Sequence, residues 1–404
     1  TSLLGREAVP VPTTIPDVLA EREQRLSAEL ADLDAADLAR HAQSDGAAQD
    51  TTLPQRQALL NQLMDIWEEM TAYGPQAVAY AAMRRGDRPT WDDIAHLADD
   101  LGPGTAVLSF FDTGDRTLVF VLGSAGTSEP IVVEAATTPQ ELRHVYLTNY
   151  QDEVLNRRRH RRAGRPFTDR WHELGQALLA PALPYLDGVE RVVLVPQGLY
   201  HLLPLHALSL NDVGETLLDR FVVSYIPALT LLDRLRQREP VEAVDAVLLG
   251  YTPADLSTPE GQVERALFLG EAEAVADQMG VSPVLNADAS AARLREMLDG
   301  NNLRLVHLSC HGHFDMQDPL RSGVLLGDGV LTAREWMGLR FRADLVTLSA
   351  CQMGMARSLG GDEMAGMSQA LLYAGASSLV MGLWSVNAAT TAAFMVDFYR
   401  RLWD

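Results

Sequence analysis

The chain contains no lysine, so all 33 of its basic residues are arginine in a sequence of 404 residues. This absence excludes a Walker A phosphate loop, a Schiff-base enzyme and a pyridoxal phosphate site, because each of these needs a lysine amine. The chemistry of the chain must therefore be carried by other side chains, and the favoured interpretation below uses no cofactor.

Cysteine is almost as scarce, since the sequence holds two cysteines, Cys310 and Cys351. Two are too few for a disulfide framework, and a free thiol suits a reducing compartment, so we expect a cytoplasmic location. Long hydrophobic runs are also lacking: none approaches the roughly 20 residues that span a bilayer, and no signal peptide opens the sequence. We therefore expect no membrane contact.

Positively charged residues are also scarce relative to acidic ones, with 33 arginines against 54 aspartates and glutamates. The formal net charge is -21 at pH 7, which argues against direct nucleic-acid binding and against attachment to an anionic membrane. Basic or neutral protein partners are favoured instead. The chain is nevertheless 47% hydrophobic, which is typical of a folded globular protein, and its length allows two or three domains.

Two short apolar runs each end in a reactive side chain. Residues 303–310 are followed by His311 and Gly312, and residues 345–350 are followed by Cys351. The carboxyl ends of parallel strands meet at one edge of a sheet. A histidine and a cysteine placed in this way can therefore reach the same crevice, although they are far apart in the sequence.

This pair of residues suits acyl transfer. A thiol attacks a carbonyl when an imidazole keeps it partly ionised and later protonates the leaving group, and we expect Cys351 and His311 to fill these two roles. The backbone N–H groups of Gly312 and Cys351 would hold the oxyanion, because a glycine lets a carbonyl approach closely. Cys310 lies within the strand and by alternation points away from His311, which predicts a buried spectator.

Further residues make the chain resemble the CHAT domain peptidases, which are relatives of caspases and separase. The resemblance rests on His311-Gly312, on Ser349-Ala350-Cys351, on residues 361–363, 370–376, 383–386 and 398–399, and on upstream matches at 195–204 and 221–227. It implies a caspase-like fold and a cysteine endopeptidase that uses His311 and Cys351 through an acyl-enzyme. It also implies control by an attached sensor region or partner, and members often act in bacterial antiviral defence or cell death.

The chain departs from the family pattern in three places. Asn387 stands where aspartate is common, Met353-Gly354 replaces the usual Thr-Gly, and the chain stops at Asp404 where relatives continue through another helix and strand. We therefore expect that the final segment of the domain is missing. The caspase signature around the cysteine is also absent, so specificity for aspartate is not carried over.

Four residues are candidates for substrate binding: Asp362, Glu363, Trp384 and Ser385. The two carboxylates precede an expected helix over 364–373, so they either cap that helix or line the pocket for the residue before the scissile bond. If Asp362 faces the pocket, an arginine or lysine side chain fits there through a charge-assisted pair. Trp384 forms either an apolar wall of that pocket or part of the core.

One basic block interrupts this acidic chain. It comprises Arg157, Arg158, Arg159, Arg161, Arg162 and Arg165. A solvated loop between domains is one interpretation of such a charge run. The other is a self-processing or docking loop, whose charge would complement an acidic specificity pocket.

Two other functions remain open on the sequence. His307, His311 and His313 with Asp315 have the ligand types of a zinc hydrolase, although the chain has no histidine beyond 313. His307 lies in mid-strand and is expected to be packed and hydrogen-bonded. The third possibility is a non-catalytic platform that keeps the caspase fold for interaction or signalling.

The expected architecture is α/β, with a caspase-like, mostly parallel sheet flanked by helices. Residues 1–100 are polar and helical, with helices over 15–38 and 53–83. Residues 101–240 form a first α/β unit without a nucleophile, beginning with strands at 105–111, 117–122 and 130–133. Residues 241–404 form the active unit, in which a strand at 246–251 precedes helices over 265–279 and 289–298.

Overall fold

The computed structural model describes residues 11–12, 14–41, 53–85, 91–102, 104–123, 129–150, 171–236, 241, 245–315, 318–350, 356–358, 364–384 and 386–403. The chain divides into two compact units, Thr1–Arg88 and Pro89–Asp404, and each is described by itself. Among the helices in these ranges, none combines the length and the apolar character that crossing a membrane requires.

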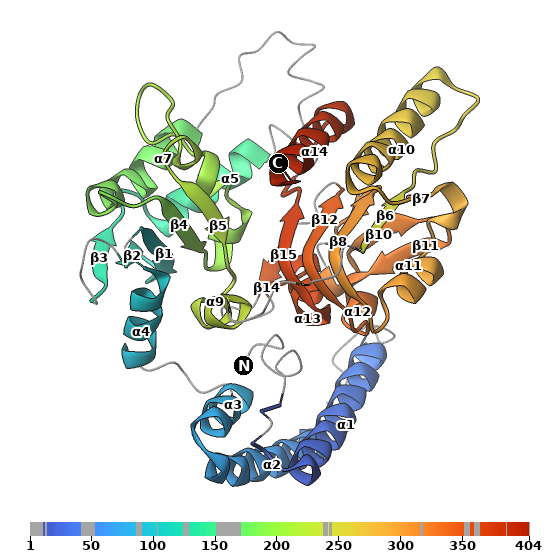
Figure 1. The fold of residues 1–404 in the computed structure, drawn as a ribbon. Coiled ribbons are helices and arrows are strands. Elements are labelled where there is room, and N and C mark those ends of the chain that lie inside the picture. The colour runs from blue at the N-terminus through green and yellow to red at the C-terminus, as the bar shows by residue number, and fades with distance from the viewer. Residues whose placement is uncertain are drawn as a thin grey trace. The chain divides into compact units, whose positions relative to one another are not determined.

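The first unit is helical, as the sequence predicts. It contains α1 (Asp17–His41), α2 (Leu53–Met70), the 3-10 turn η2 (Thr71–Tyr73) and α3 (Pro75–Arg85), drawn in blue in Figure 1. The single helix expected over 53–83 is interrupted, because Gly74 takes a left-handed φ of 100° that ends one helix, and Pro75 begins the next.

A buried carboxylate joins the three helices of this unit. Glu23 on α1 is 2% exposed and accepts hydrogen bonds from Trp67 Nε1 at 2.7 Å and from the Tyr80 hydroxyl at 2.6 Å. Its charge is neutralised by an ion pair with Arg84. A buried charge is tolerated when it is paired and hydrogen-bonded, so this cluster fixes how the helices pack.

The second unit contains a mixed sheet with strand order β3-β2-β1-β4-β5. Its strands are β1 (Thr105–Asp112), β2 (Thr117–Leu122), β3 (Ile131–Glu134), β4 (Arg191–Val195) and β5 (Val222–Tyr225). The β1, β4 and β5 strands run parallel, whereas β2 and β3 are antiparallel additions.

Helices cover both faces of this mixed sheet. On one face, α5 (Pro139–Tyr150) and α7 (Trp171–Leu178) contribute side chains to the same apolar cluster as β1, β2 and β4. On the other face, α4 (Trp91–Leu101) and α9 (Leu229–Arg236) pack on a second apolar cluster. The connections after β4 include α8 (Leu217–Arg220) and the 3-10 turns η5 (Gly198–Leu202) and η6 (Leu205–Ala207).

A second, wholly parallel sheet has strand order β15-β12-β8-β6-β7. Its strands are β6 (Ala246–Gly250), β7 (Val284–Leu285), β8 (Asn302–Ser309), β12 (Arg342–Ser349) and β15 (Ala376–Met381). Two small antiparallel ribbons accompany it, one from β9 (Gly312–His313), β10 (Gly323–Leu326) and β11 (Gly329–Thr332), the other from β13 (Ala356–Ser358) and β14 (Met364–Gly366).

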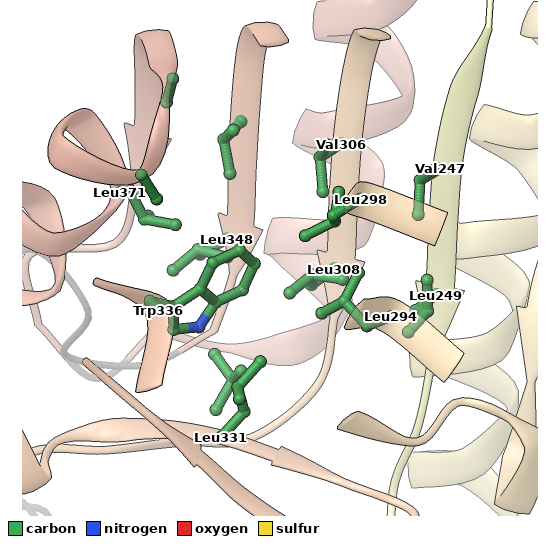
Figure 2. Close-up of a cluster of buried hydrophobic side chains, with 14 of the residues drawn as sticks. Val247, Leu249, Leu294, Leu298, Val306, Leu308, Leu331, Trp336, Leu348 and Leu371 are labelled. Atoms are coloured by element: carbon green, nitrogen blue, oxygen red, sulfur yellow. The ribbon is translucent and has the colours of Figure 1, made fainter. Parts of the chain in front are cut away.

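Strand alternation divides the apolar side chains between the two faces of the parallel sheet. Val306 and Leu308 face α11 (Ala291–Leu298), α12 (Ala333–Trp336) and α13 (Met367–Ala374), in the cluster around Trp336 that Figure 2 shows. Leu305 belongs to the opposite cluster, with residues of α10 (Pro259–Met279) and α14 (Ala388–Trp403). Helices therefore cover both faces, as Figure 1 also shows.

The predicted α/β fold class, with parallel strands flanked by helices, is confirmed. The expected strands at 105–111, 117–122 and 130–133 correspond to β1, β2 and β3, because they are short apolar runs, the first two of which are separated by the turn at Gly114-Asp115. The helix expected over 265–279 begins earlier, at Pro259, since the Thr258 side chain accepts a hydrogen bond from the Gly261 N–H and caps it.

Gly375, which ends α13, gives a test of the close packing of the parallel sheet. Its φ is 131°, and a Cβ at this position would lie 1.6 Å from the Phe341 carbonyl oxygen. We expect Gly375→Ala to lower the free energy of unfolding by about 3 kcal/mol or more. Gly270→Ala is the matched control: a Cβ there meets nothing within 4 Å, so it should stabilise α10 by about 1 kcal/mol. Urea denaturation measures both, and equal midpoints would contradict the expectation.

Candidate active site

Three neighbouring strands of the parallel sheet end at the same level. Gly250 of β6 pairs with Ser309 of β8, and Ser309 pairs with Ser349 of β12. Two residues beyond these ends stand Thr252 and His311, and the corresponding position after β12 is Cys351, which lies outside the described residues. The register thus places Thr252 and His311 at one edge of the sheet.

The histidine segment is held in place by the β9–β10 ribbon. The Leu325 N–H donates to the His311 carbonyl oxygen at 2.8 Å, and the next pair in the register is Gly312 with Val324. In an antiparallel ribbon, hydrogen-bonded pairs alternate with pairs whose N–H groups point outward. The Gly312 N–H is accordingly directed away from β10.

A cavity of about 160 Å³ opens beside His311. Its lining comes from α10, from the ends of β8 and β12, and from the start of α14. The lining residues are Glu264, Leu267, Phe268, Glu271, Cys310, His311, Ser349, Ala350, Val386, Ala388 and Thr391. About half of these side chains are apolar, and the polar groups are the two carboxylates, the imidazole and the hydroxyls of Ser349 and Thr391.

His311 makes its polar contacts with α10 and with the segment after β6. Its Nε2 lies 2.8 Å from Glu264 Oε1 and 3.4 Å from the Thr252 hydroxyl oxygen. Phe268 lies one helical turn beyond Glu264 and packs its ring against the imidazole, with 4.7 Å between the ring centroids. The imidazole is 39% exposed, so solvent and substrate can reach it.

Glu264 is poised to stay ionised. The Thr252 hydroxyl donates to Glu264 Oε1, and this hydrogen bond, followed by the one from His311, holds the pKa of the Glu264 carboxyl below its usual value. The carboxylate side chain is 38% exposed, so water still screens its charge in part. The site therefore presents a negative charge directly to the histidine ring.

Cys310 is buried, as the sequence predicts, with 1% exposure. Burial, with a contribution from the nearby Glu271 carboxylate, raises the pKa of the Cys310 thiol. It is therefore unsuited to attack a substrate. Its side chain packs in the same apolar cluster as Val306 and Leu308, as strand alternation predicts, and the residue also lines the cavity beside His311.

A buried polar network lies beneath the cavity. His307 is fully buried, and its Nδ1 lies 3.2 Å from the Tyr399 hydroxyl, which donates to Thr347 Oγ1 at 2.6 Å. On its other side, His307 Nε2 lies 3.2 Å from Glu271 Oε1, within ion-pair distance but without hydrogen-bond geometry. His307 is thus a packed, hydrogen-bonded residue, as its position in mid-strand predicted.

The histidines expected in a zinc site do not come together. His307 lies within the sheet against Tyr399, His311 contacts Glu264, and His313 is exposed on β9. Across the parts of the chain that the structure describes, no three side chains of metal-binding type are grouped closely enough to hold an ion.

The structure describes one of the four candidate substrate-binding residues. Trp384 stacks on Trp171 of α7, with ring centroids 5.7 Å apart, and is not among the residues that line the cavity. The others, and all six arginines of the basic block, lie outside the described residues: Asp362, Glu363, Ser385, Arg157, Arg158, Arg159, Arg161, Arg162 and Arg165.

The sequence analysis missed the partners that α10 supplies. Glu264, Phe268 and Glu271 recur at spacings of four and three, which places them on one face of a helix. That spacing was visible in the sequence, but an acidic residue on a helix is usually solvated, so nothing distinguished Glu264 before its contact with His311 was known.

The fold and the site define an α/β domain with a histidine-bearing cavity at the carboxyl edge of a parallel sheet. A comparison with protein families matches residues 168–404 to the CHAT domain. This match covers more than half of the sequence, and the chain belongs to the CHAT domain family, whose domain is of the cysteine peptidase type.

Two further comparisons were made. A search of the curated proteins found no match. Among solved structures, the chain is similar to a chain in the crystal structure of the Saccharomyces cerevisiae separase–securin complex, with 11% sequence identity and a TM-score of 0.47. The alignment covers 98% of this chain but 39% of that one, so this chain spans well under half of its length.

The Tyr399 hydroxyl gives a test of the buried network. Tyr399→Phe removes a donor to Thr347 and a partner of His307, and both groups then stay buried without it. We expect the free energy of unfolding to fall by about 2 kcal/mol. Tyr185→Phe serves as the control, because Tyr185 is 39% exposed and its change should stay within about 0.5 kcal/mol. Equal urea midpoints for the two variants would show that the network adds no stability.

Proposed function

We propose that this chain is a cysteine endopeptidase in which Cys351 is the nucleophile and His311 is its base and acid. The observation that carries the proposal is the matched ending of β8 and β12, where Ser309 pairs with Ser349. His311 and Cys351 follow these residues by the same number of positions, and Ala350, which precedes Cys351, lines the cavity beside His311.

The proposed reaction proceeds through an acyl-enzyme. The thiol proton moves from Cys351 to His311, the thiolate attacks the scissile carbonyl carbon, and the imidazolium then protonates the leaving amine. Water, deprotonated by the same imidazole, hydrolyses the thioester and releases the acid product. Cys310 cannot substitute as nucleophile, since burial keeps its thiol protonated.

The oxyanion is proposed to bind to the backbone N–H groups of Gly312 and Cys351. The ribbon supports the first donor, because the hydrogen bond between Leu325 and His311 leaves the Gly312 N–H directed away from β10. A donor fixed by a ribbon needs no rearrangement when charge develops on the substrate oxygen.

The remaining sequence predictions extend this proposal. We infer that residues 101–240 form an inactive α/β domain behind the peptidase domain at 241–404, that a partner protein or a sensor region regulates it, and that it acts in the cytoplasm on a protein substrate. Bacterial defence or cell-death signalling is the setting the family suggests. The basic block at 157–165 is then a self-processing or docking loop.

The alternative function is a non-catalytic platform that keeps the caspase fold for interaction or signalling, and a labelling experiment distinguishes it from a peptidase. Peptide acyloxymethyl ketones that differ in the residue next to the warhead should label Cys351, read by intact and peptide mass spectrometry, and Cys351→Ala should abolish both labelling and turnover without unfolding. The Cys310 peptide in the same digest is the internal control. Retained turnover in Cys351→Ala would defeat the assignment, and fragments ending at 157–165 would indicate self-processing.

Asp362 is proposed to select a basic residue before the scissile bond. If its carboxylate faces the pocket, probes with arginine or lysine next to the warhead should label Cys351 faster than leucine probes. Asp362→Asn should lower this ratio of labelling rates about 10-fold. The helix expected over 364–373 begins only at Met367, after β14 and with Gly366 at its N-cap, so Asp362 is too far away to cap it. An unchanged order of probes in Asp362→Asn would overturn the selection of a basic residue.

A further inference from the structure

His311 is held by a set of contacts that a dyad alone does not require. Its Nε2 lies 2.8 Å from Glu264 Oε1, and the same oxygen accepts the hydroxyl of Thr252. Phe268, one turn along α10 from Glu264, packs against the ring. Carboxylate, hydroxyl and phenyl ring therefore converge on one imidazole from two different segments of the chain.

We propose that Glu264 is the positioning residue of His311, and that Thr252 fixes Glu264 for this task. The proposal rests on the proposed function and deepens it. It adds Glu264 to the Cys351 and His311 dyad as the residue that orients the imidazole, and it adds Thr252 as the residue that orients Glu264. Glu264 acts through the histidine and does not touch the substrate.

The chemistry of the carboxylate determines which ring nitrogen carries the proton. An ionised carboxylate only accepts hydrogen bonds, so the 2.8 Å contact requires a proton on His311 Nε2. Nδ1 is then the nitrogen with a free lone pair. It can take the proton from the Cys351 sulfur as that sulfur attacks, and later pass the same proton to the nitrogen of the leaving amine.

Charge gives the second part of the role. When Nδ1 takes the thiol proton the ring becomes an imidazolium, and Glu264 is the carboxylate in hydrogen-bond contact with it. The hydrogen bond from Thr252 keeps the Glu264 carboxyl ionised. Opposite charge at this distance favours the thiolate–imidazolium pair, although partial exposure of both groups moderates the gain.

Glu271, the other acid that lines the cavity, is not suited to this role. It is 5% exposed and lies 3.2 Å from His307 Nε2, so its charge is directed into the sheet rather than toward His311. Among the described residues that line the cavity, the ionisable groups besides the imidazole are Glu264, Glu271 and the buried Cys310. Of these, Glu264 is the one in direct contact with the ring.

The test compares Glu264→Gln with Glu273→Gln in the full chain. Glu273 is an exposed acid on the same helix that does not line the cavity, so the two variants lose the same charge. Iodoacetamide alkylation of Cys351 is followed against pH by peptide mass spectrometry. We expect Glu264→Gln to move the midpoint of the profile up by about one pH unit, which is about a 10-fold slower reaction on the acid side, while Glu273→Gln follows the parent.

Thr252 supplies a graded second test. Thr252→Val removes the hydroxyl that donates to Glu264 and should shift the midpoint of the alkylation profile in the same direction by a smaller amount. Thr252→Ser keeps a hydroxyl, so its midpoint should lie close to that of the parent chain.

The 15N shifts of His311 report the tautomer directly, and the proton should lie on Nε2 in the parent chain.

The outcomes separate this role from the peptidase function. A proton on Nδ1, or a Glu264→Gln profile that matches Glu273→Gln, overturns the role of Glu264 even if peptides are cleaved. An acid-shifted Cys351 with the proton on Nε2, but no cleavage of any peptide, removes the proposed function and leaves the role of Glu264 standing. A parent profile like that of free cysteine overturns both.

Discussion

The register of three parallel strands is the constraint on which the rest of the site depends. The pairing of Gly250, Ser309 and Ser349 fixes the level at which β6, β8 and β12 end, so Thr252 and His311 follow their strands at the same edge of the sheet. A shift of one residue would turn every side chain of a strand to the opposite face. Because both faces are covered by helices, burial of apolar side chains resists such a shift, and the sheet core thereby sets the level at which His311 follows β8.

The helix that follows β6 then supplies what the strand ends lack. In a parallel sheet each strand must be followed by a crossover, and here α10 crosses the face of the sheet below the cavity. Its inward face carries apolar residues that pack on the sheet and also the two acids that line the cavity. One acid meets the exposed His311 and the other meets the buried His307. One helix therefore contributes both to the core and to the electrostatics of the site.

The sequence was informative where local pattern and long-range structure agree. Short apolar runs predicted β1, β2 and β3, and the abrupt ends of the later apolar runs pointed to the edge of the sheet where the cavity lies. It was less informative where a contact joins distant segments: Glu264 and His311 are 47 positions apart, and no local rule connects them. The orientation of Cys310 was predictable from alternation, because its side chain packs in the same cluster as Val306 and Leu308.

The Tyr399 hydroxyl described above links α14 to β8 and β12 through His307 and Thr347. Unwinding of the last turns of α14 would leave the His307 imidazole and the Thr347 hydroxyl buried without this partner. Local opening at the end of this helix is therefore tied to the loss of hydrogen bonds inside the parallel sheet, and slow amide exchange in the last turns of α14 would be its signature.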